Sequence, residues 1–176
     1  KEIIKAQREI FRRFHLDEKT EQLYPFQLSG GMARRVLVST AVLSGAEVII
    51  ADEPTPGLDL EMALEALKIF RELSDEGKAV ILITHDIDLA FHIADRIAVF
   101  YAGTTVEIAA AKDFLEGVDA LPQNGFEPIP GFQPYAKYLP KGCLFSPRCP
   151  HKTKECEENI PMREVRGGYV RCIHAD

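Results

Sequence analysis

The stretch Val48-Ile49-Ile50-Ala51-Asp52-Glu53 places two carboxylates directly after four apolar residues. A short apolar run, partly β-branched, is typical of a strand buried on both faces of a parallel sheet. Ala79 to Thr84 is a second such run, and His85 follows it. Ligands of open α/β sheets bind at the carboxyl ends of the strands. We therefore predict a chemical site formed by Asp52, Glu53 and His85 at one edge of a sheet.

The sequence around these two runs alternates between helix and strand patterns. Helices are expected at residues 1–16, 32–43, 60–76 and 88–94, and a further strand at 96–101 turns into a hairpin with residues 106–108. Connections this short predict an α/β fold with a parallel sheet and right-handed crossovers.

Length and composition limit the possible classes of protein. The 176 residues are 46% hydrophobic and carry a formal net charge of −6, which argues against a general nucleic-acid binder. No window reaches the roughly 18 apolar residues of a membrane-spanning helix, and the N-terminus lacks the pattern of a secretory signal. The chain also starts without Met, which is consistent with a start inside a longer gene product.

Charge, proline and cysteine are unevenly distributed and divide the chain in two. Residues 1–110 contain 12 basic and 18 acidic residues, whereas residues 111–176 contain 9 of each. Eight of the 11 prolines and all four cysteines lie in the second part. We predict an α/β domain at 1–110, followed by a linker and a small, irregular, cysteine-rich module at 111–176.

Each candidate site residue has a functional and a structural interpretation. Asp52 can hold Mg²⁺ while Glu53 accepts a proton from an attacking water, as phosphoryl transfer requires, or both are solvent-facing acids. His85 can hydrogen-bond a terminal phosphate and a carboxylate, or it is structural. The loop Ser29-Gly30-Gly31 before a helix favours an anion such as phosphate, or it is an ordinary N-terminal turn. Asp59 can simply cap its helix.

The order and spacing of these motifs resemble those of the ATP-binding-cassette (ABC) ATPases over roughly residues 20–110. The carrying stretches are Leu28-Ser29-Gly30-Gly31-Met32, Val48 to Thr55, Gly57-Leu58-Asp59 and Thr84-His85-Asp86. The resemblance implies ATP binding by Ser29, Gly30, Gly31 and Asp59, Mg²⁺ binding by Asp52, Glu53 as the catalytic base and His85 as the switch histidine.

The chain departs from the family pattern in two places. Ser29, Gly30 and Gly31 match the signature motif of the family, and Arg34 stands where that motif is commonly followed by Gln. No Gly-x-x-x-x-Gly-Lys-Ser/Thr phosphate loop (P-loop) occurs in the sequence. The resemblance therefore implies the C-terminal part of a P-loop ATPase, and we expect the chain alone to be inactive.

The four cysteines occur as Cys143-x5-Cys149-x6-Cys156-x15-Cys172. Four thiolates suit a [4Fe–4S] cluster or a structural Zn²⁺, or they are reduced and unconnected. Residues 140–150 and the later cysteines resemble the C-terminal extension of oligopeptide, dipeptide and nickel importer ATPases. That resemblance implies an iron–sulfur cluster on these four cysteines. The segment near residues 118–122 is shortened relative to that subfamily, or residues are missing there.

The combined resemblance implies an ATPase subunit that couples ATP hydrolysis to import of peptides or nickel. It implies a second ATPase subunit, transmembrane permease subunits and indirectly a solute-binding protein as partners, and a cytoplasmic location on the inner face of the membrane. One alternative is a soluble ABC ATPase of DNA repair or condensation. Another is a non-enzymatic metal-binding fragment.

Overall fold

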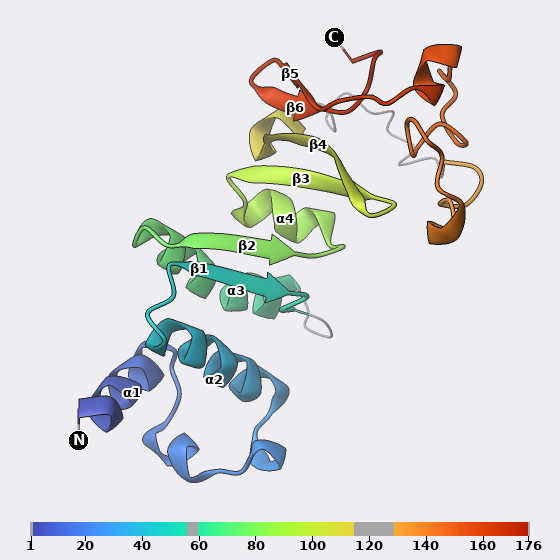
Figure 1. The fold of residues 1–176 in the computed structure, drawn as a ribbon. Helices are drawn as coiled ribbons and strands as arrows, with labels where there is room; N and C mark the ends of the chain where they lie inside the picture. The colour runs from blue at the N-terminus through green and yellow to red at the C-terminus, as the bar shows by residue number, and fades with distance from the viewer. Residues whose placement is uncertain (1, 56–59, 115–128, 176) are drawn as a thin grey trace. The chain divides into compact units, whose positions relative to one another are not determined.

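The computed structural model describes residues 2–55, 60–114 and 129–175 (Figure 1). The chain forms two compact units, which divide between Ile93 and Ala94. The first unit contains α1 (Glu2–Arg13), α2 (Gly30–Leu43), β1 (Val48–Asp52), α3 (Leu60–Asp75), β2 (Ala79–Ile83) and α4 (Ile87–Ile93). The second contains β3 (Arg96–Tyr101), β4 (Thr104–Ala110), β5 (Arg163–Val165) and β6 (Gly168–Val170). No helix in the described part of the chain is long and apolar enough to cross a membrane.

The parallel arrangement expected for the first unit is confirmed. β1 and β2 pair in parallel, with Val48 opposite Ala79 and Asp52 opposite Ile83, and α3 connects them. Alternate residues of β1 point into a core that α3 and α4 complete. Its buried members are Ile49, Ala51, Ala63, Leu67, Phe70, Leu73 and Leu89. The ends of β1 and β2 are thereby fixed at the same edge of the sheet.

The expectation that both faces of these strands are buried is wrong for the described residues. The other face carries Val48, Ile50, Ile81 and Ile83, which are all exposed. The apolar runs arise because both sets of alternating residues are apolar, whereas helices cover only one set.

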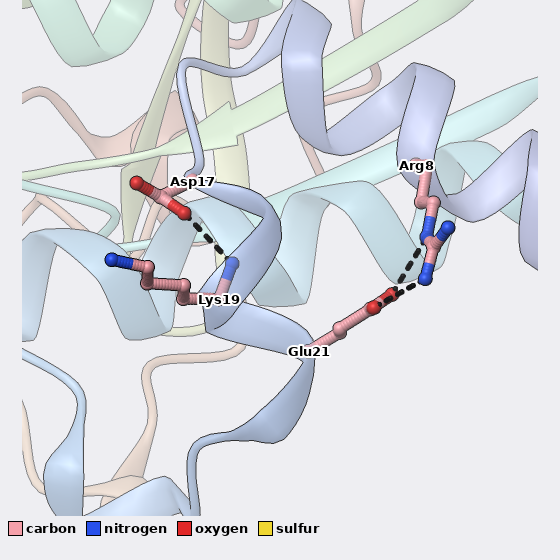
Figure 2. A network of polar contacts seen from close by, with 4 residues as sticks. All are labelled: Arg8, Asp17, Lys19 and Glu21. Carbon is pink, nitrogen blue, oxygen red and sulfur yellow. Dashed lines mark hydrogen bonds and ion pairs between the residues drawn. The ribbon is translucent and has the colours of Figure 1, made fainter.

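Helix α1 is held to the following 3-10 turn, Glu18–Gln22, by an ion pair. Arg8 donates two hydrogen bonds to the Glu21 carboxylate, of 3.1 and 2.6 Å, and Asp17 caps the turn by accepting from the Lys19 amide (Figure 2). Phe14 is completely buried beyond the end of α1. This arrangement fixes the segment that leads to the glycine pair at residues 30–31.

The second unit is built on a four-stranded antiparallel sheet with the order β3-β4-β6-β5. β6 pairs with β4, with Ile108 opposite Tyr169, so the hairpin at 96–110 groups with the cysteine-rich residues. The division therefore differs from the boundary expected at residue 110. The C-terminal part is also less irregular than expected, because β5 and β6 are three-residue strands too short to show alternation and are stabilised by pairing with β4.

Candidate functional site

Glu53 and His85 meet at the carboxyl ends of β1 and β2. The Glu53 amide donates to the carbonyl of Ile83 (2.9 Å), which extends the strand pairing by one bond. His85 Nδ1 lies 2.7 Å from Glu53 Oε1, and the His85 backbone amide donates to the same oxygen over 3.2 Å. The strand register thus brings together two predicted site residues that are separated by 32 positions.

The electrostatics of this pair favour a protonated histidine. The hydrogen bond with Glu53, its negative charge and, less strongly, the charge of Asp86 raise the pKa of His85 above its ordinary value. The His85 side chain is 86% exposed and that of Glu53 38% exposed, so solvent screens the interaction. Glu53 has φ of +45°, a left-handed backbone conformation that is uncommon outside glycine.

Asp52 is the last residue of β1 and is exposed next to Glu53. Within the described residues, no group of three or more histidine, cysteine or acidic side chains gathers closely enough to hold a metal ion. A single carboxylate beside a phosphate-binding site is nevertheless how proteins often hold Mg²⁺, because the ion keeps several waters. The role of Asp52 in Mg²⁺ binding remains a prediction.

The glycines predicted as a loop form the first turn of α2 instead. Ser29 is the N-cap, and its Oγ accepts from the Met32 amide over 3.3 Å. A Cβ at Gly30 or Gly31 would meet no atom of the described chain within 4 Å. Packing within this chain therefore does not demand glycine there, and the first amides of α2 are open to an approaching anion.

Asp59, the remaining predicted ATP contact, lies outside the described residues, as does the stretch near 118–122 that is shortened relative to the subfamily. The four cysteines are described and none forms a disulfide. The amide of Cys143 donates to the carbonyl of Cys156 over 2.8 Å.

His174 connects two of the cysteines. Its Nε2 lies 3.8 Å from Cys156 Sγ, and its amide approaches Cys172 Sγ at 3.4 Å. Arg163 fixes this end of the chain by donating to the carbonyls of Cys172 and Ala175. The segments carrying the cysteines are thus adjacent, although their thiols do not form a metal-binding group in the described residues. His174 is not among the predicted metal ligands, which are the four cysteines.

The rings of Tyr24 and Phe26 stack in the turn before Ser29, a contact that the sequence does not predict. In the sequence, only the placement of an aromatic residue on each side of Pro25 points to this contact.

Comparison with known proteins gives two family matches. Residues 2–56 match the ABC transporter family, and residues 118–156 match the C-terminal region of oligopeptide/dipeptide transporters. Among curated relatives, the oligopeptide transport ATP-binding protein OppD of Salmonella typhimurium is 37% identical over 168 residues, covering 87% of this chain and 50% of OppD. The dipeptide transport ATP-binding protein DppD of Bacillus subtilis is 37% identical over 158 residues, covering 81% of this chain and 47% of DppD.

Solved structures agree in fold. A dimeric, post-hydrolysis ATP-binding cassette, MJ0796 bound to ADP and Pi, superposes with a TM-score of 0.54 at 29% identity, covering 61% of this chain and 46% of that one. The protein cbiO1 of Clostridium perfringens, part of the ABC transporter complex cbiONQ, gives 0.58 at 27% identity, covering 65% and 46%. The chain spans about half the length of the curated relatives it matches.

Proposed function

Because this chain belongs to the ABC transporter family and carries the C-terminal region of oligopeptide/dipeptide transporters, we propose that it supplies half of an ATPase that drives peptide import. The half is the one with the signature motif, the two site carboxylates and the cysteine-rich module. Relatives named for oligopeptides and dipeptides favour peptides as cargo over nickel.

The observation that carries the proposal is the Glu53–His85 pair at the ends of adjacent parallel strands. Glu53 orients a water and accepts its proton, because the hydrogen bond with His85 fixes the direction of its carboxylate. His85 holds Glu53 and presents its other ring nitrogen to a terminal phosphate. Phosphoryl transfer relies on this kind of positioning more than on covalent chemistry by the protein.

Asp52 would hold Mg²⁺, which neutralises phosphate charge when bound. Ser29, Gly30 and Gly31 would offer the hydroxyl and amides at the start of α2 to the phosphates of ATP, and Asp59 would contribute across the interface between subunits. This sequence contains no P-loop motif, which the family mechanism requires for ATP binding. We therefore propose that this chain alone neither binds ATP tightly nor hydrolyses it.

The partners that follow are a second ATPase subunit, transmembrane permease subunits and indirectly a solute-binding protein. The working location is the inner face of the cell membrane, where the ATPase binds peripherally. The dimeric cassette structure supports the second ATPase subunit, since a signature motif acts on nucleotide held by the opposite subunit in the family mechanism.

We propose that Cys143, Cys149, Cys156 and Cys172 together bind a [4Fe–4S] cluster, with Zn²⁺ as the alternative. Four free thiols in adjacent segments are a suitable donor set for either. The thiols do not gather in the described structure, so binding requires their side chains to reorient.

A substitution of Glu53 tests the ATPase assignment in the intact subunit. Glu53→Gln keeps the size of the side chain but removes the base, so we expect ATP hydrolysis to fall by about 10²-fold or more while ATP binding persists. Glu107→Gln, an exposed acidic residue of β4, is the matched control and is expected to hydrolyse ATP normally. Hydrolysis by the Glu53→Gln subunit at the parental rate would exclude this role.

The isolated chain provides a second measurement. Mg²⁺-dependent hydrolysis by the 176-residue chain that disappears on Glu53→Gln would contradict the proposal that it is inactive alone.

The cysteine proposal is tested by spectroscopy on anaerobically purified protein. A broad absorption near ~400 nm with bound iron is expected for the cluster, and colourless protein with bound zinc is expected for the alternative. Protein that binds neither metal would show that the cysteines are simple thiols.

A further inference from the structure

Helix α1 is joined to the end of α3 by an arginine. Arg13, the last residue of α1, donates to Glu76 Oε2 over 3.1 Å and lies 2.6 Å from Glu76 Oε1. Glu72 Oε2, one helical turn earlier, lies 3.9 Å from the same guanidinium. The guanidinium also lies 5.5 Å from the centroid of the Phe14 ring. A guanidinium bound by both oxygens of one carboxylate has a fixed direction, which a point charge such as lysine does not provide.

The end of α1 is joined in turn to the signature motif. Arg35, in the second turn of α2, donates from Nη1 to the carbonyls of Phe14 and His15 over 3.4 and 3.3 Å. Its Nε donates to the carbonyl of Gly31 over 3.3 Å. Phe14 is completely buried, so packing as well as hydrogen bonding anchors this junction. Arg35 therefore holds the signature turn and the end of α1 together.

Helix α3 is fixed relative to the two strands that precede the candidate catalytic residues. It connects β1 to β2, and its Leu67, Phe70 and Leu73 are buried in the core. Glu76 extends α3 by one residue, because its amide donates to the Glu72 carbonyl over 3.0 Å. A residue bound to Glu76 is therefore bound to the body of the sheet.

These contacts form a continuous path from Glu76 through Arg13 and Arg35 to Gly31. Continuous networks of this kind can carry energetic coupling between distant parts of a protein. We propose that Arg13 is a positioning residue, which sets where the signature-bearing start of α2 lies relative to the sheet that carries Glu53. A salt bridge that only stabilises the fold is the competing interpretation, and the test separates the two.

The inference rests on the proposed function, in which the signature motif acts on nucleotide held by the opposite subunit. A displaced signature motif then weakens closure of the dimer but leaves the binding of ATP by a single subunit unchanged. A salt bridge with a purely stabilising role affects the thermal unfolding midpoint and neither of these two quantities.

The test uses the intact ATPase subunit carrying Glu53→Gln, so that bound ATP is not consumed, and follows ATP-driven dimer formation by light scattering. Glu76→Gln removes the charge of the Arg13 partner and keeps its size. We expect it to raise the half-saturating ATP concentration for dimer formation by about two- to fivefold, the effect typical of a partly exposed ion pair. Binding of a fluorescent ATP analogue, measured at a protein concentration too low for dimers, should keep its parental affinity.

Asp75→Asn is the matched control. Asp75 is the neighbour of Glu76 and pairs with Arg71 over 2.7 Å within α3, so the substitution breaks an ion pair that does not reach α1. Its ATP requirement for dimer formation should equal that of the parent.

Exchange of the two charges identifies the pair itself as the cause. Arg13→Glu alone places a third carboxylate beside Glu72 and Glu76, so its ATP requirement should exceed that of Glu76→Gln. The double variant Arg13→Glu/Glu76→Arg should return to within about twofold of the parent, because contacting residues are not additive.

An unchanged ATP requirement in Glu76→Gln, with or without a lower unfolding midpoint, would overturn the inference in favour of a purely stabilising salt bridge. An equal increase in Asp75→Asn, a loss of ATP affinity in the single subunit, or a double variant as impaired as Arg13→Glu would also overturn it. A parent that fails to dimerise with ATP would overturn the proposed function and this inference with it.

Discussion

Glu53 receives two hydrogen bonds from one residue, since both the ring and the amide of His85 contact Oε1. Its φ of +45° directs the chain away from β1 directly after the strand ends. A left-handed non-glycine residue costs free energy that other contacts must offset. Here the cost is offset by the hydrogen bond from the Glu53 amide to the Ile83 carbonyl and by the two hydrogen bonds between Glu53 Oε1 and His85. The position of the candidate base therefore depends on His85 as well as on its own strand.

At the residue scale, the pair predicts a pH-dependent interaction. Glu53 raises the pKa of His85, so the folded protein binds this proton more tightly than the unfolded chain. Its contribution to stability is complete below the ordinary value of 6.5 and is lost as the pH rises through the raised value. We expect an NMR titration to place the His85 midpoint above 6.5, and Glu53→Gln to bring it down.

The assignment of the His85 signal can be made from the spectrum of His85→Asn. An identical His85 midpoint with and without the Glu53 carboxylate would show that the two side chains do not interact in solution.

At the scale of elements, the cysteine-rich part depends on close backbone approach. A Cβ on Gly142 would collide with the backbone of Cys156 and Glu158. The neighbouring Cys143 amide donates to the Cys156 carbonyl over 2.8 Å. The segments around residues 142 and 156 can approach this closely only because residue 142 is glycine. On the other side, β6 joins this part to β4, where Gly168 approaches the Ile108 carbonyl closely. The absence of a side chain at Gly142 and Gly168 thus allows close backbone contact between the cysteine segments and between β6 and β4.

Gly142→Ala tests this packing. The added methyl forces the Cys143 and Cys156 segments apart, and overpacking of this kind typically costs about 1–3 kcal/mol. We expect lower thermal stability of the C-terminal unit and weaker metal binding, measured by circular dichroism and metal analysis.

Lys141→Ala, at the exposed neighbouring position, is the control and should leave both quantities unchanged. If Gly142→Ala melts at the parental temperature, the close approach does not exist in solution.

At the scale of the whole molecule, the described first unit leaves an apolar sheet face uncovered. The chain spans about half the length of the curated relatives it matches, and we expect the additional length of such a relative to cover the corresponding face. In the chain by itself the face is open to water. Exposed apolar patches of this kind promote association.

We therefore expect the isolated chain to self-associate, and the double variant Ile50→Thr/Ile81→Thr to reduce this. Threonine keeps the β-branched shape that suits a strand while removing part of the apolar surface. Sedimentation at several concentrations measures the effect.

Ile87→Thr, at another exposed apolar position of the same unit, is the control and should associate like the parent. Equal association of the double variant and the parent would show that another surface is responsible.

Local sequence patterns were sufficient to predict two strands and the family of this protein. The apolar runs before Asp52 and His85 predicted the parallel pair β1 and β2, although only one face of these strands is covered in the described residues. The order of the motifs likewise predicted the family, because each motif is a contiguous stretch that can be recognised from its own residues.

Only the tertiary structure decided the features that depend on strand register and chain crossing. The 2.7 Å contact of His85 with Glu53 follows from Asp52 lying opposite Ile83, a pairing that neither strand specifies alone. β5 and β6 form because β4 offers an edge to strands too short to show a pattern. The stacking of Tyr24 on Phe26 is set by a turn closed through the Gln27 side chain. In each case the free energy comes from partners distant in sequence or from a specific turn geometry, which composition and periodicity do not encode.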